Sequence, residues 1–437
     1  SPPWSGAWYH FIMKQTAGIC LRGTVALPGD KSIAHRAALF ASIARGKSVI
    51  ERYPSGEDCQ RTLDLLEAIG VPVERQHYRV SISGKGYLGF RAPSSTLYAG
   101  NSGTTLRMAC GLLAPQPFDS HLTGDESLER RPMRRVIDPL EQMGARIEST
   151  EEGRAPLHIR GGRSLKGILY RSPVASAQVK TAVLLAGLHA EGDTRVQEPL
   201  PSRNHTELAL MRFGVPVSID EDGVRITGGS ELQSTRIRIP GDISSAAFFI
   251  VGAAVFPGSN LLVADVGLNP TRTAFIEVLR SMGARVTIEE EQEQDGEVIG
   301  TVRVEGAELA GVEVPAERVP GLIDEIPALA VAASFAHGET IIRGASELRV
   351  KESDRIHALA TGLRALNVEV EELPDGLRIR GGRPMRAASL DSFGDHRIAM
   401  AWGVASLGVD GACQIKGKSA ASVSFPEFWE TLDQAVA

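Results

Sequence analysis

Six polar loops stand directly before apolar helical stretches, and several of them carry a lysine or an arginine. They are residues 29–36 (GDKSIAHR), 100–107 (GNSGTTLR), 175–180 (ASAQVK), 241–245 (GDISS), 324–327 (DEIP) and 394–400 (GDHRIAM). The first turn of a helix exposes backbone N–H groups at the positive end of the helix dipole, so it attracts anions. A neighbouring cation adds charge-assisted hydrogen bonds to phosphate or carboxylate. A single loop of this kind can be a capped helix with a solvated charge, but six of them predict a ligand with several negative charges.

Two segments place further cations near predicted helices. In the segment ERRPMRR, Arg131 precedes a proline, which is favoured in a first helical turn, so Arg131 is predicted at a helix start. In the segment RVKESDR, Lys351 and Arg355 are spaced i and i+4 and should share one helix face, while Glu352 and Arg355 are i, i+3 neighbours. Either segment alone could also be a solvated ion-pair surface.

Two histidines differ in their surroundings. His396 lies between Asp395 and Arg397 in a glycine-led loop at a predicted helix start, which makes it a candidate site residue. His35 lies on an apolar helical stretch, and a structural role is predicted for it.

Composition excludes several classes of protein. The 437 residues are 43% apolar and 23% charged with a net charge of −6, which is typical of a globular protein and lacks the overall basic character of a nucleic-acid binder. The four scattered cysteines form no C-x-x-C pair, so neither a disulfide framework nor a structural zinc site is expected. No metal-ligand, P-loop or dinucleotide motif occurs. We therefore expect a phosphorylated substrate handled by Lys and Arg, with no metal and no redox cofactor.

The chain also shows no apolar run long enough to span a membrane, and a reducing cytoplasm is the expected compartment. Residues 1–12 resemble neither a signal peptide nor a transit peptide, and Met13 is a candidate natural start.

A repeat of roughly 70 residues organises the chain. Five predicted helices end in L-x-x-x-G or L-x-x-x-N, which suits a left-handed C-cap, at residues 66–70, 140–144, 210–214, 279–283 and 363–367. Each is followed by a short alternating strand that ends in glycine, at residues 80–84, 157–161, 224–228, 302–306 and 377–381.

Two series of helices accompany these strands. Six are apolar nearly all round and are predicted to be buried, at residues 32–45, 102–114, 177–190, 244–255, 326–336 and 397–407. Six are amphipathic, at residues 58–69, 131–143, 205–213, 271–282, 352–366 and 425–435. The pattern predicts a pseudo-symmetric α/β protein that divides three plus three near residue 240. A tandem α/β array without a shared site is the alternative, because fold alone does not define function.

The blocks at these loops, in their order along the chain, resemble the signature blocks of 5-enolpyruvylshikimate-3-phosphate (EPSP) synthases. They are LPGDKSIAHR, GNSGTTLR, LTGDESLERRP, SAQVK, SRNHTE, PGDISSAAFF, DEIPALA, ELRVKESDR and GDHRIAMA, from about residue 18 onward. The SAQVK block is similar to the group often called class II.

The resemblance implies a two-lobed, pseudo-symmetric inside-out α/β barrel. Each lobe would hold three repeats of a βαβαββ-type unit with buried parallel helices. Residues 30–240 would form the lobe that binds mainly shikimate 3-phosphate. Residues 241–437, with an N-terminal strand at about 14–29, would form the lobe that closes over phosphoenolpyruvate. Because two lobes complete one site, a monomer is expected, with these two small molecules as its partners and with neither nucleic acid nor membrane.

The resemblance also implies binding residues at matching positions. Those for shikimate 3-phosphate are Lys31, Ser32, Arg36, Ser176, Ala177, Gln178, Ser202, Arg203, Asp324 and Lys351, with the phosphate among Ser176, Ser202 and Arg203. Those for phosphoenolpyruvate are Lys31, Asn101, Gly103, Arg131, Gln178, Arg355, His396 and Arg397. Asp58 and Asn101 would support the site. Gly103 keeps the small residue where members of this glyphosate-targeted family set access of the inhibitor.

The implied reaction is an addition followed by an elimination, in the biosynthesis of chorismate and the aromatic amino acids. The substrate 5-hydroxyl adds to C2 of phosphoenolpyruvate while C3 gains a proton, and phosphate then leaves. Asp324 and Lys31 are expected at the hydroxyl, with Glu352 as the proton carrier to C3, although the two carboxylates could exchange roles. The chain departs from the family pattern at one place, because Ser422 and Val423 stand where many members have a lysine. Lys416 or Lys418 could take the role of that lysine.

Three other functions are alternatives to this one. UDP-N-acetylglucosamine enolpyruvyl transferase typically has a nucleophilic cysteine in the loop that corresponds to residues 122–132, where this chain has none. RNA 3′-phosphate cyclase should use a histidine nucleophile with ATP, and the acidic balance does not support it. A non-catalytic binder of phosphorylated metabolites would not need both Asp324 and Glu352.

Overall fold

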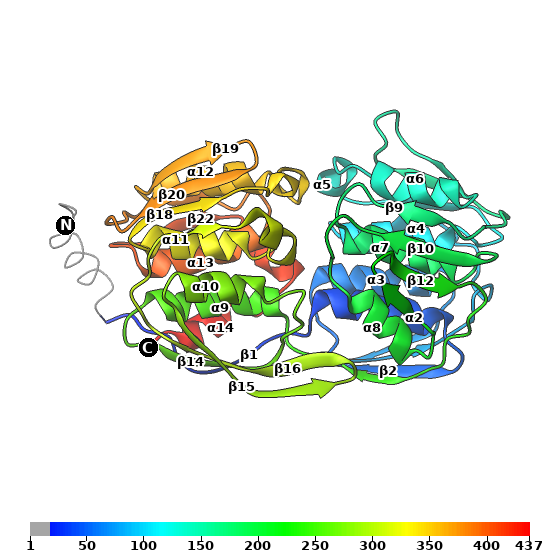
Figure 1. Ribbon diagram of the computed structural model, residues 1–437, viewed down its shortest axis with the longest axis horizontal. Coiled ribbons are helices and arrows are strands. Elements are labelled where there is room, and N and C mark those ends of the chain that lie inside the picture. Colours follow the sequence, from blue (N-terminus) through cyan, green and yellow to red (C-terminus); the bar gives the residue numbers. More distant parts are fainter. Residues whose placement is uncertain (1–17) are drawn as a thin grey trace. The chain divides into compact units, whose positions relative to one another are not determined.

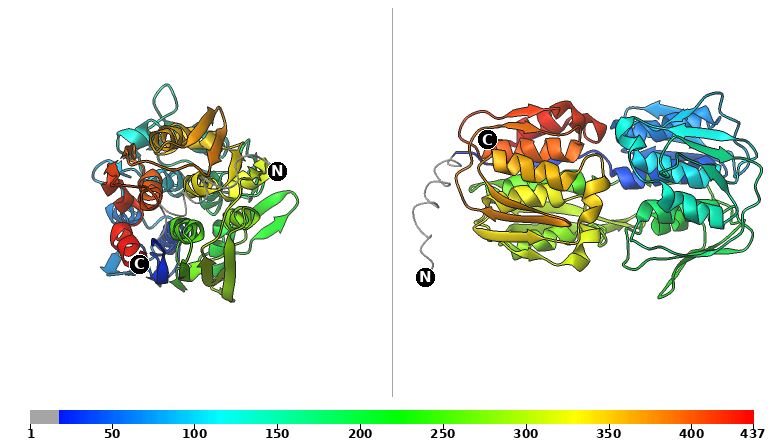
Figure 2. Two further views of the ribbon diagram at one scale, coloured as in Figure 1. Left: turned by 90° about the vertical axis from the view of Figure 1, so that its left-hand side faces the viewer. Right: turned by 90° about the horizontal axis from the view of Figure 1, so that it is seen from above.

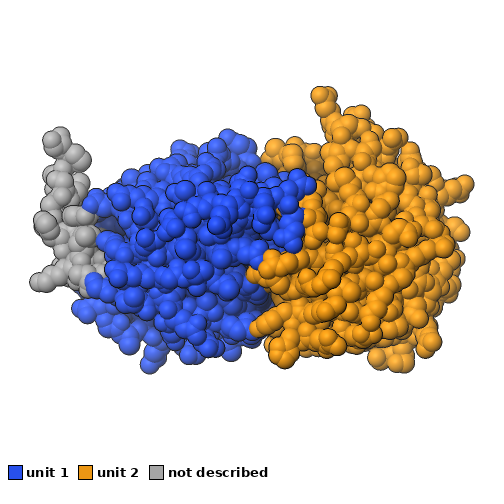
Figure 3. Space-filling model, turned by 90° about the horizontal axis from the view of Figure 1, so that it is seen from below, with its two compact units in different colours: residues 1–28, 240–294, 298–437 blue, residues 29–239, 295–297 orange. Residues whose placement is uncertain are grey.

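The computed structural model describes residues 18–437, which form two compact units (Figures 1 and 3). Unit 1 comprises residues 18–28, 240–294 and 298–437 of the described chain, and unit 2 comprises residues 29–239 and 295–297. Residues 1–12, Met13 and the beginning of the predicted N-terminal strand, residues 14–17, lie outside the described residues. No helix within residues 18–437 is both long enough and apolar enough to cross a membrane.

Unit 2 contains three four-stranded sheets with one repeated pairing pattern, in which the first two strands are parallel and the others antiparallel. The first sheet has β13 (Arg236–Arg238), β2 (Lys47–Glu51), β4 (Arg79–Ser83) and β3 (Val73–Gln76). The second has β5 (Leu97–Tyr98), β6 (Ser120–Thr123), β8 (Leu157–Arg160) and β7 (Arg146–Glu148). The third has β9 (Leu169–Arg171), β10 (Asp193–Gln197), β12 (Gly223–Thr227) and β11 (Ser218–Asp220).

Three apolar helices form the core of unit 2, and further helices cover it. The buried ones are α2 (Lys31–Ile43), α4 (Gly103–Leu113) and α7 (Ala177–Gly187). The others are α3 (Glu57–Ala68), α5 (Glu126–Glu129), α6 (Arg134–Gln142) and α8 (His205–Arg212). Because α4 packs against both α2 and α7, the three helix starts are held by one shared core.

Unit 1 repeats this organisation, with strands of the described chain in three further sheets. The first has β1 (Arg22–Ala26), β14 (Asn260–Gly267), β16 (Glu297–Glu305) and β15 (Arg285–Gln294). The second has β17 (Glu313–Val314), β18 (Gly338–Ile342), β20 (Gly376–Gly381) and β19 (Glu369–Leu373). The third pairs β21 (Ser389–Asp391) with β22 (Gln414–Lys416). In the left view of Figure 2, which faces unit 1, its strands lie around its helices.

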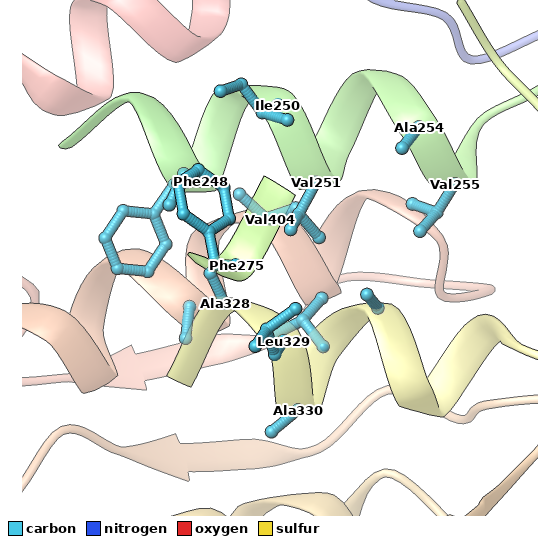
Figure 4. Packing of buried hydrophobic residues seen from close by; sticks show 14 of the residues in the cluster. Phe248, Ile250, Val251, Ala254, Val255, Phe275, Ala328, Leu329, Ala330 and Val404 are labelled. Atoms are coloured by element: carbon cyan, nitrogen blue, oxygen red, sulfur yellow. The ribbon is translucent and has the colours of Figure 1, made fainter. Parts of the chain in front are cut away.

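The core of unit 1 is built on three mutually packed helices, α9 (Ile243–Val255), α11 (Ile326–Phe335) and α13 (His396–Leu407). Figure 4 shows Phe248, Leu329 and Val404 meeting between them. Each of these side chains is almost fully buried, which stabilises the fold by about 1.5–3 kcal/mol apiece. The remaining helices are α10 (Ala274–Ser281), α12 (Arg355–Ala365), α14 (Phe428–Ala435) and the 3-10 turns η1 (Ala316–Gly321), η2 (Ser346–Val350) and η3 (Lys418–Val423).

The sequence prediction of the buried helices is confirmed, since each observed start lies within one residue of the predicted one. The predicted left-handed caps are also confirmed. Gly70, Gly144, Gly214, Gly283 and Asn367 have φ of +87°, +108°, +85°, +98° and +71°.

Four of the six amphipathic helices begin three residues later than predicted, since α6, α10, α12 and α14 start at Arg134, Ala274, Arg355 and Phe428. Arg131 does not begin a helix, because α6 starts at Arg134 and the N–H of Met133 donates to Gly153 O at 2.9 Å, which holds the preceding turn away from the helix. The helix predicted from residue 352 begins at Arg355, where Asp354 caps it by accepting from the N–H of His357 at 3.0 Å. Lys351 and Glu352 therefore precede α12, so the i, i+4 argument does not apply to them.

Candidate active site

In unit 2, the start of α2 carries the first cationic group. Asp30 caps the helix by accepting from the N–H of Ile33 at 3.0 Å, and Lys31 is the first helical residue. The Lys31 ammonium lies 2.7 Å from Oδ2 of Asp58, and the two side chains are 14% and 10% exposed. The pair is thus accessible but partly buried, so water screens its electrostatic interactions less than on an open surface.

Arg36, one turn further along α2, ties three segments together. Its Nε donates to Oγ1 of Thr206 at 2.7 Å, Nη1 to Ser32 O at 2.8 Å and Nη2 to Ala177 O at 3.2 Å. Arg203 reaches the same place, since its Nη1 lies 3.4 Å from Oγ of Ser32. These contacts bring the starts of α2, α7 and α8 to one location that carries two guanidinium groups.

The start of α4 holds a second group. Nη2 of Arg131 donates to Oδ1 of Asn101 at 3.3 Å. A Cβ at Gly103 would lie only 2.9 Å from Nη1 of Arg131 and 3.0 Å from Nη1 of Arg107. Because real Cβ atoms do not approach so closely, the absence of a side chain at Gly103 lets both arginines reach this helix start.

Gln178 in the first turn of α7 connects this group to the first. Its Oε1 accepts from Nη1 of Arg107 at 2.8 Å, and its Nε2 donates to Oγ1 of Thr104 at 2.9 Å. Arg107 was not among the predicted site residues, although its place in the GNSGTTLR loop was a signal for it.

In unit 1, the functional groups converge on Arg355, whose side chain is 1% exposed. Nε donates to Oδ2 of Asp395 at 2.8 Å and Nη2 to Oε2 of Glu352 at 2.7 Å, and Nη1 lies 3.4 Å from Oδ1 of Asp324. Burial alone would lower the pKa of Arg355, but these three carboxylates outweigh it and raise the pKa, so the guanidinium stays charged.

Asp324 is surrounded by cationic side chains. Besides Arg355, its carboxylate lies 3.9 Å from Nζ of Lys351 and 3.8 Å from Nη2 of Arg397. Arg397 also donates through Nη1 to Asp324 O at 3.2 Å. Desolvation lowers the pKa of Lys351, and the Asp324 carboxylate partly opposes this shift.

Asp395 positions α13 as well as Arg355. Its Oδ1 accepts from the N–H of Arg397 at 2.9 Å, which caps the helix, and the carboxylate is fully buried. His396 is the first residue of α13 and is 2% exposed. Asp395 was not among the predicted site residues, although an Asp before an apolar helix is a recognisable N-cap signal.

The C-terminal segment contains no lysine at the expected position. Ser422 lies in η3 and donates to Ser419 O at 2.7 Å. The ammonium of Lys418 lies 5.6 Å from the ring centroid of Trp429, a cation–π contact, and Lys416 is an exposed residue of β22.

Within residues 18–437, no group of three or more His, Cys, Asp or Glu is arranged to hold a metal ion.

Comparison with known proteins supports one family. The family model of EPSP synthase (3-phosphoshikimate 1-carboxyvinyltransferase) matches residues 16–432. A 3-phosphoshikimate 1-carboxyvinyltransferase of Desulfitobacterium hafniense is 50% identical over 415 residues, which cover 95% of each chain. The enzyme of that name from Xanthomonas euvesicatoria is 48% identical over 431 residues, covering 98% of this chain and 97% of the relative.

Solved structures agree with these sequence matches. The structure of EPSP synthase from Acinetobacter baumannii has a TM-score of 0.85 at 44% identity, covering 96% of this chain and 98% of that one. An enolpyruvyl transferase from Streptomyces tendae, at 18% identity and a TM-score of 0.78, shows the shared fold alone. The predicted resemblance and the two-domain inside-out α/β fold are therefore confirmed, and the chain belongs to the family of EPSP synthases, the 3-phosphoshikimate 1-carboxyvinyltransferases.

Proposed function

We propose that the two clusters described above hold the two substrates of the reaction that this chain catalyses. That reaction is the transfer of the enolpyruvyl group of phosphoenolpyruvate to shikimate 3-phosphate in aromatic biosynthesis. The observation that carries the proposal is that each unit gathers cations and carboxylates from separate segments at the starts of its buried helices.

Shikimate 3-phosphate is assigned mainly to unit 2. Arg36 and Arg203 bring two positive charges to the start of α7, where backbone N–H groups also favour an anion. The hydroxyls of Ser176 and Ser202 are suitable donors for the 3-phosphate. The other proposed contacts are Lys31, Ser32, Ala177 and Gln178 from unit 2, and Asp324 and Lys351 from unit 1.

Phosphoenolpyruvate carries a carboxylate and a phosphate, so it requires several cations. Arg131, Arg355 and Arg397 are proposed to hold these two groups, because guanidinium groups form charge-assisted hydrogen bonds to carboxylate and phosphate. Gly103 supports this assignment by allowing Arg131 to approach the start of α4. Lys31, Asn101, Gln178 and His396 are the remaining proposed contacts.

The 5-hydroxyl of shikimate 3-phosphate adds to C2 of phosphoenolpyruvate while C3 gains a proton, and phosphate then leaves from the tetrahedral adduct. We assign Asp324 and Lys31 to the hydroxyl proton, and Glu352 to the proton that C3 gains. Three cations within 4 Å stabilise negative charge on Asp324, which fits a group that must start the reaction ionised. Arginines would then stabilise the charge that develops on the departing phosphate.

The substrate dependence of phosphate release tests this function. Phosphate should be released from phosphoenolpyruvate only when shikimate 3-phosphate is present. Release that depends on UDP-N-acetylglucosamine would identify the sister transferase instead, and binding of either substrate without turnover would identify a non-catalytic binder.

The role of Glu352 can be tested against a matched ion pair. Glu352→Gln removes a carboxylate that binds Arg355 at 2.7 Å and should lower kcat at least tenfold, the lower range expected of a general acid. The control is Glu372→Gln, because Glu372 binds Arg349 at 3.0 Å in an ion pair of similar length that is more exposed and lies outside the cluster. Its kcat should stay within about twofold of wild type. A Glu352→Gln enzyme with unchanged kcat would remove Glu352 from the proton transfer.

We also propose that the enzyme works as a monomer in the cytoplasm, with a lobe of residues 30–240 and a second lobe of residues 241–437 plus the N-terminal strand. Size-exclusion chromatography coupled to light scattering tests the monomeric state, because a mass twice that of the chain would contradict it.

A further inference from the structure

Glu198, which directly follows β10, connects the two segments that carry the serines assigned to the substrate phosphate. Its Oε1 accepts from the N–H of Ser176 at 2.8 Å. Its Oε2 accepts from Oγ of Ser202 at 2.7 Å and from the N–H of Ser202 at 3.3 Å. One carboxylate therefore sets the distance between the segment before α7 and the segment before α8.

The charge of Glu198 is compensated inside the protein. Nζ of Lys180, on α7, lies 3.2 Å from Oε2 of Glu198 and 2.7 Å from Oε1 of Glu207. The side chain of Glu198 is 8% exposed, and those of Lys180 and Glu207 are each 3% exposed. Because desolvating charges is costly, a buried trio of this kind contributes little net stability, although removing one member is destabilising. Its arrangement is better explained by what it holds in place.

We propose that Glu198 is a positioning residue for the phosphate of shikimate 3-phosphate, acting through Ser176 and Ser202. This inference rests on the proposed phosphate site. Ser176 caps α7 by accepting from the N–H of Val179 at 3.4 Å, and this bond leaves the Ser176 hydroxyl with its own proton to donate. Glu198 accepts from the backbone N–H of Ser176 and so fixes the position of the residue that carries that hydroxyl.

Ser202 has a single hydroxyl proton, which it donates to Glu198 in this structure. A phosphate dianion offers only acceptors, so its binding requires the Ser202 hydroxyl to turn from Glu198 to the ligand. Glu198 keeps three donors after that turn, namely the two serine N–H groups and the Lys180 ammonium. The Glu198 carboxylate therefore keeps hydrogen-bond donors when the Ser202 hydroxyl turns to the phosphate.

Glu198→Gln tests the inference, because an amide cannot accept at both positions and would place an NH₂ group beside either Ser176 N–H or the Lys180 ammonium. The KM for shikimate 3-phosphate should rise about 10- to 100-fold, as expected for the loss of one charged hydrogen bond. The KM for phosphoenolpyruvate and kcat should stay within about threefold. The affinity for shikimate, which has no phosphate, should not change, and this readout excludes a general loss of folding.

Glu207→Gln is the matched control, because Glu207 binds the same Lys180 ammonium at 2.7 Å, whereas the contacts to Ser176 and Ser202 described above belong to Glu198. It should change the KM for shikimate 3-phosphate by less than about threefold. Glu198→Asp keeps the charge beside Lys180 and is one methylene too short to reach both serines, so it should reproduce the KM effect even if the Gln variant folds poorly.

Two further variants separate failure of this inference from failure of the phosphate site. If Ser202→Ala and Arg203→Ala leave the KM for shikimate 3-phosphate unchanged, the proposed phosphate site is wrong. If both raise that KM while Glu198→Gln and Glu198→Asp stay within twofold of wild type, the phosphate site stands and the positioning role of Glu198 is refuted.

Discussion

Replacing His35 by asparagine should leave catalysis intact and remove part of the acid sensitivity of folding. His35 lies on α2 between Lys31 and Arg36 and is 1% exposed. Its Nδ1 is 2.7 Å from Oγ1 of Thr62. Burial lowers the pKa of His35 from 6.5 to about 3, with Asp58 opposing the shift and the neighbouring cations adding to it. The imidazole is therefore neutral over the range in which it could serve as an acid or base.

The size of the effect follows from proton linkage. Because the pKa is lower in the folded protein, the unfolded chain binds more protons between pH 6.5 and about 3, and stability falls as the pH falls through this window. With pKa values of 6.5 and about 3, the loss between pH 7 and pH 5 is about 2 kcal/mol. Asparagine places an amide near the Nδ1 position and does not titrate, so its cost in lost packing is the same at both pH values.

The assay is urea unfolding of wild type and His35→Asn at pH 7 and pH 5, followed by circular dichroism. Other titrating groups are common to both proteins and cancel in the difference. The free-energy gap between the two proteins should shrink by about 2 kcal/mol on going to pH 5, and kcat should stay within about threefold. An equal gap at both pH values, or a hundredfold loss of kcat, would refute the structural role.

Three further outcomes are expected. Arg355→Lys should lower kcat/KM about 100-fold, because one ammonium cannot replace the guanidinium contacts to Asp395, Glu352 and Asp324; a loss below fivefold in steady-state assays would contradict this. Wild-type kcat/KM should decline as the pH rises through a pKa below 10.5, as the Lys351 ammonium loses its proton, and Lys351→Arg should move that decline to higher pH in the same rate profile. Asn367→Ala should be about 1 kcal/mol less stable than Asn367→Gly in urea unfolding, because residue 367 has φ of +71°; equal stability would mean that this cap is unstrained.

Much of the fold could be predicted from short-range patterns in the chain. The buried helices are recognisable because a continuous apolar stretch has no solvent face, and their caps because only Gly or Asn tolerates a positive φ at low cost. The substrate class followed from cations beside glycine-rich helix starts, and the family followed from nine ordered blocks. These features depend on residues within a few positions of one another, so periodicity and residue type reveal them.

Contacts between segments that are distant in the sequence could not be predicted from such local patterns. Glu198 lies 22 residues from Ser176, and Arg355 lies 40 residues from Asp395, so no local pattern pairs them. The hydrogen bond from Met133 N–H to Gly153 O likewise joins residues 20 positions apart. It accompanies the start of α6 at Arg134 instead of at the predicted Arg131. Side-chain propensities act along the chain, whereas the partner of a buried charge is chosen by packing in three dimensions, and only the folded structure reveals which partner it finds.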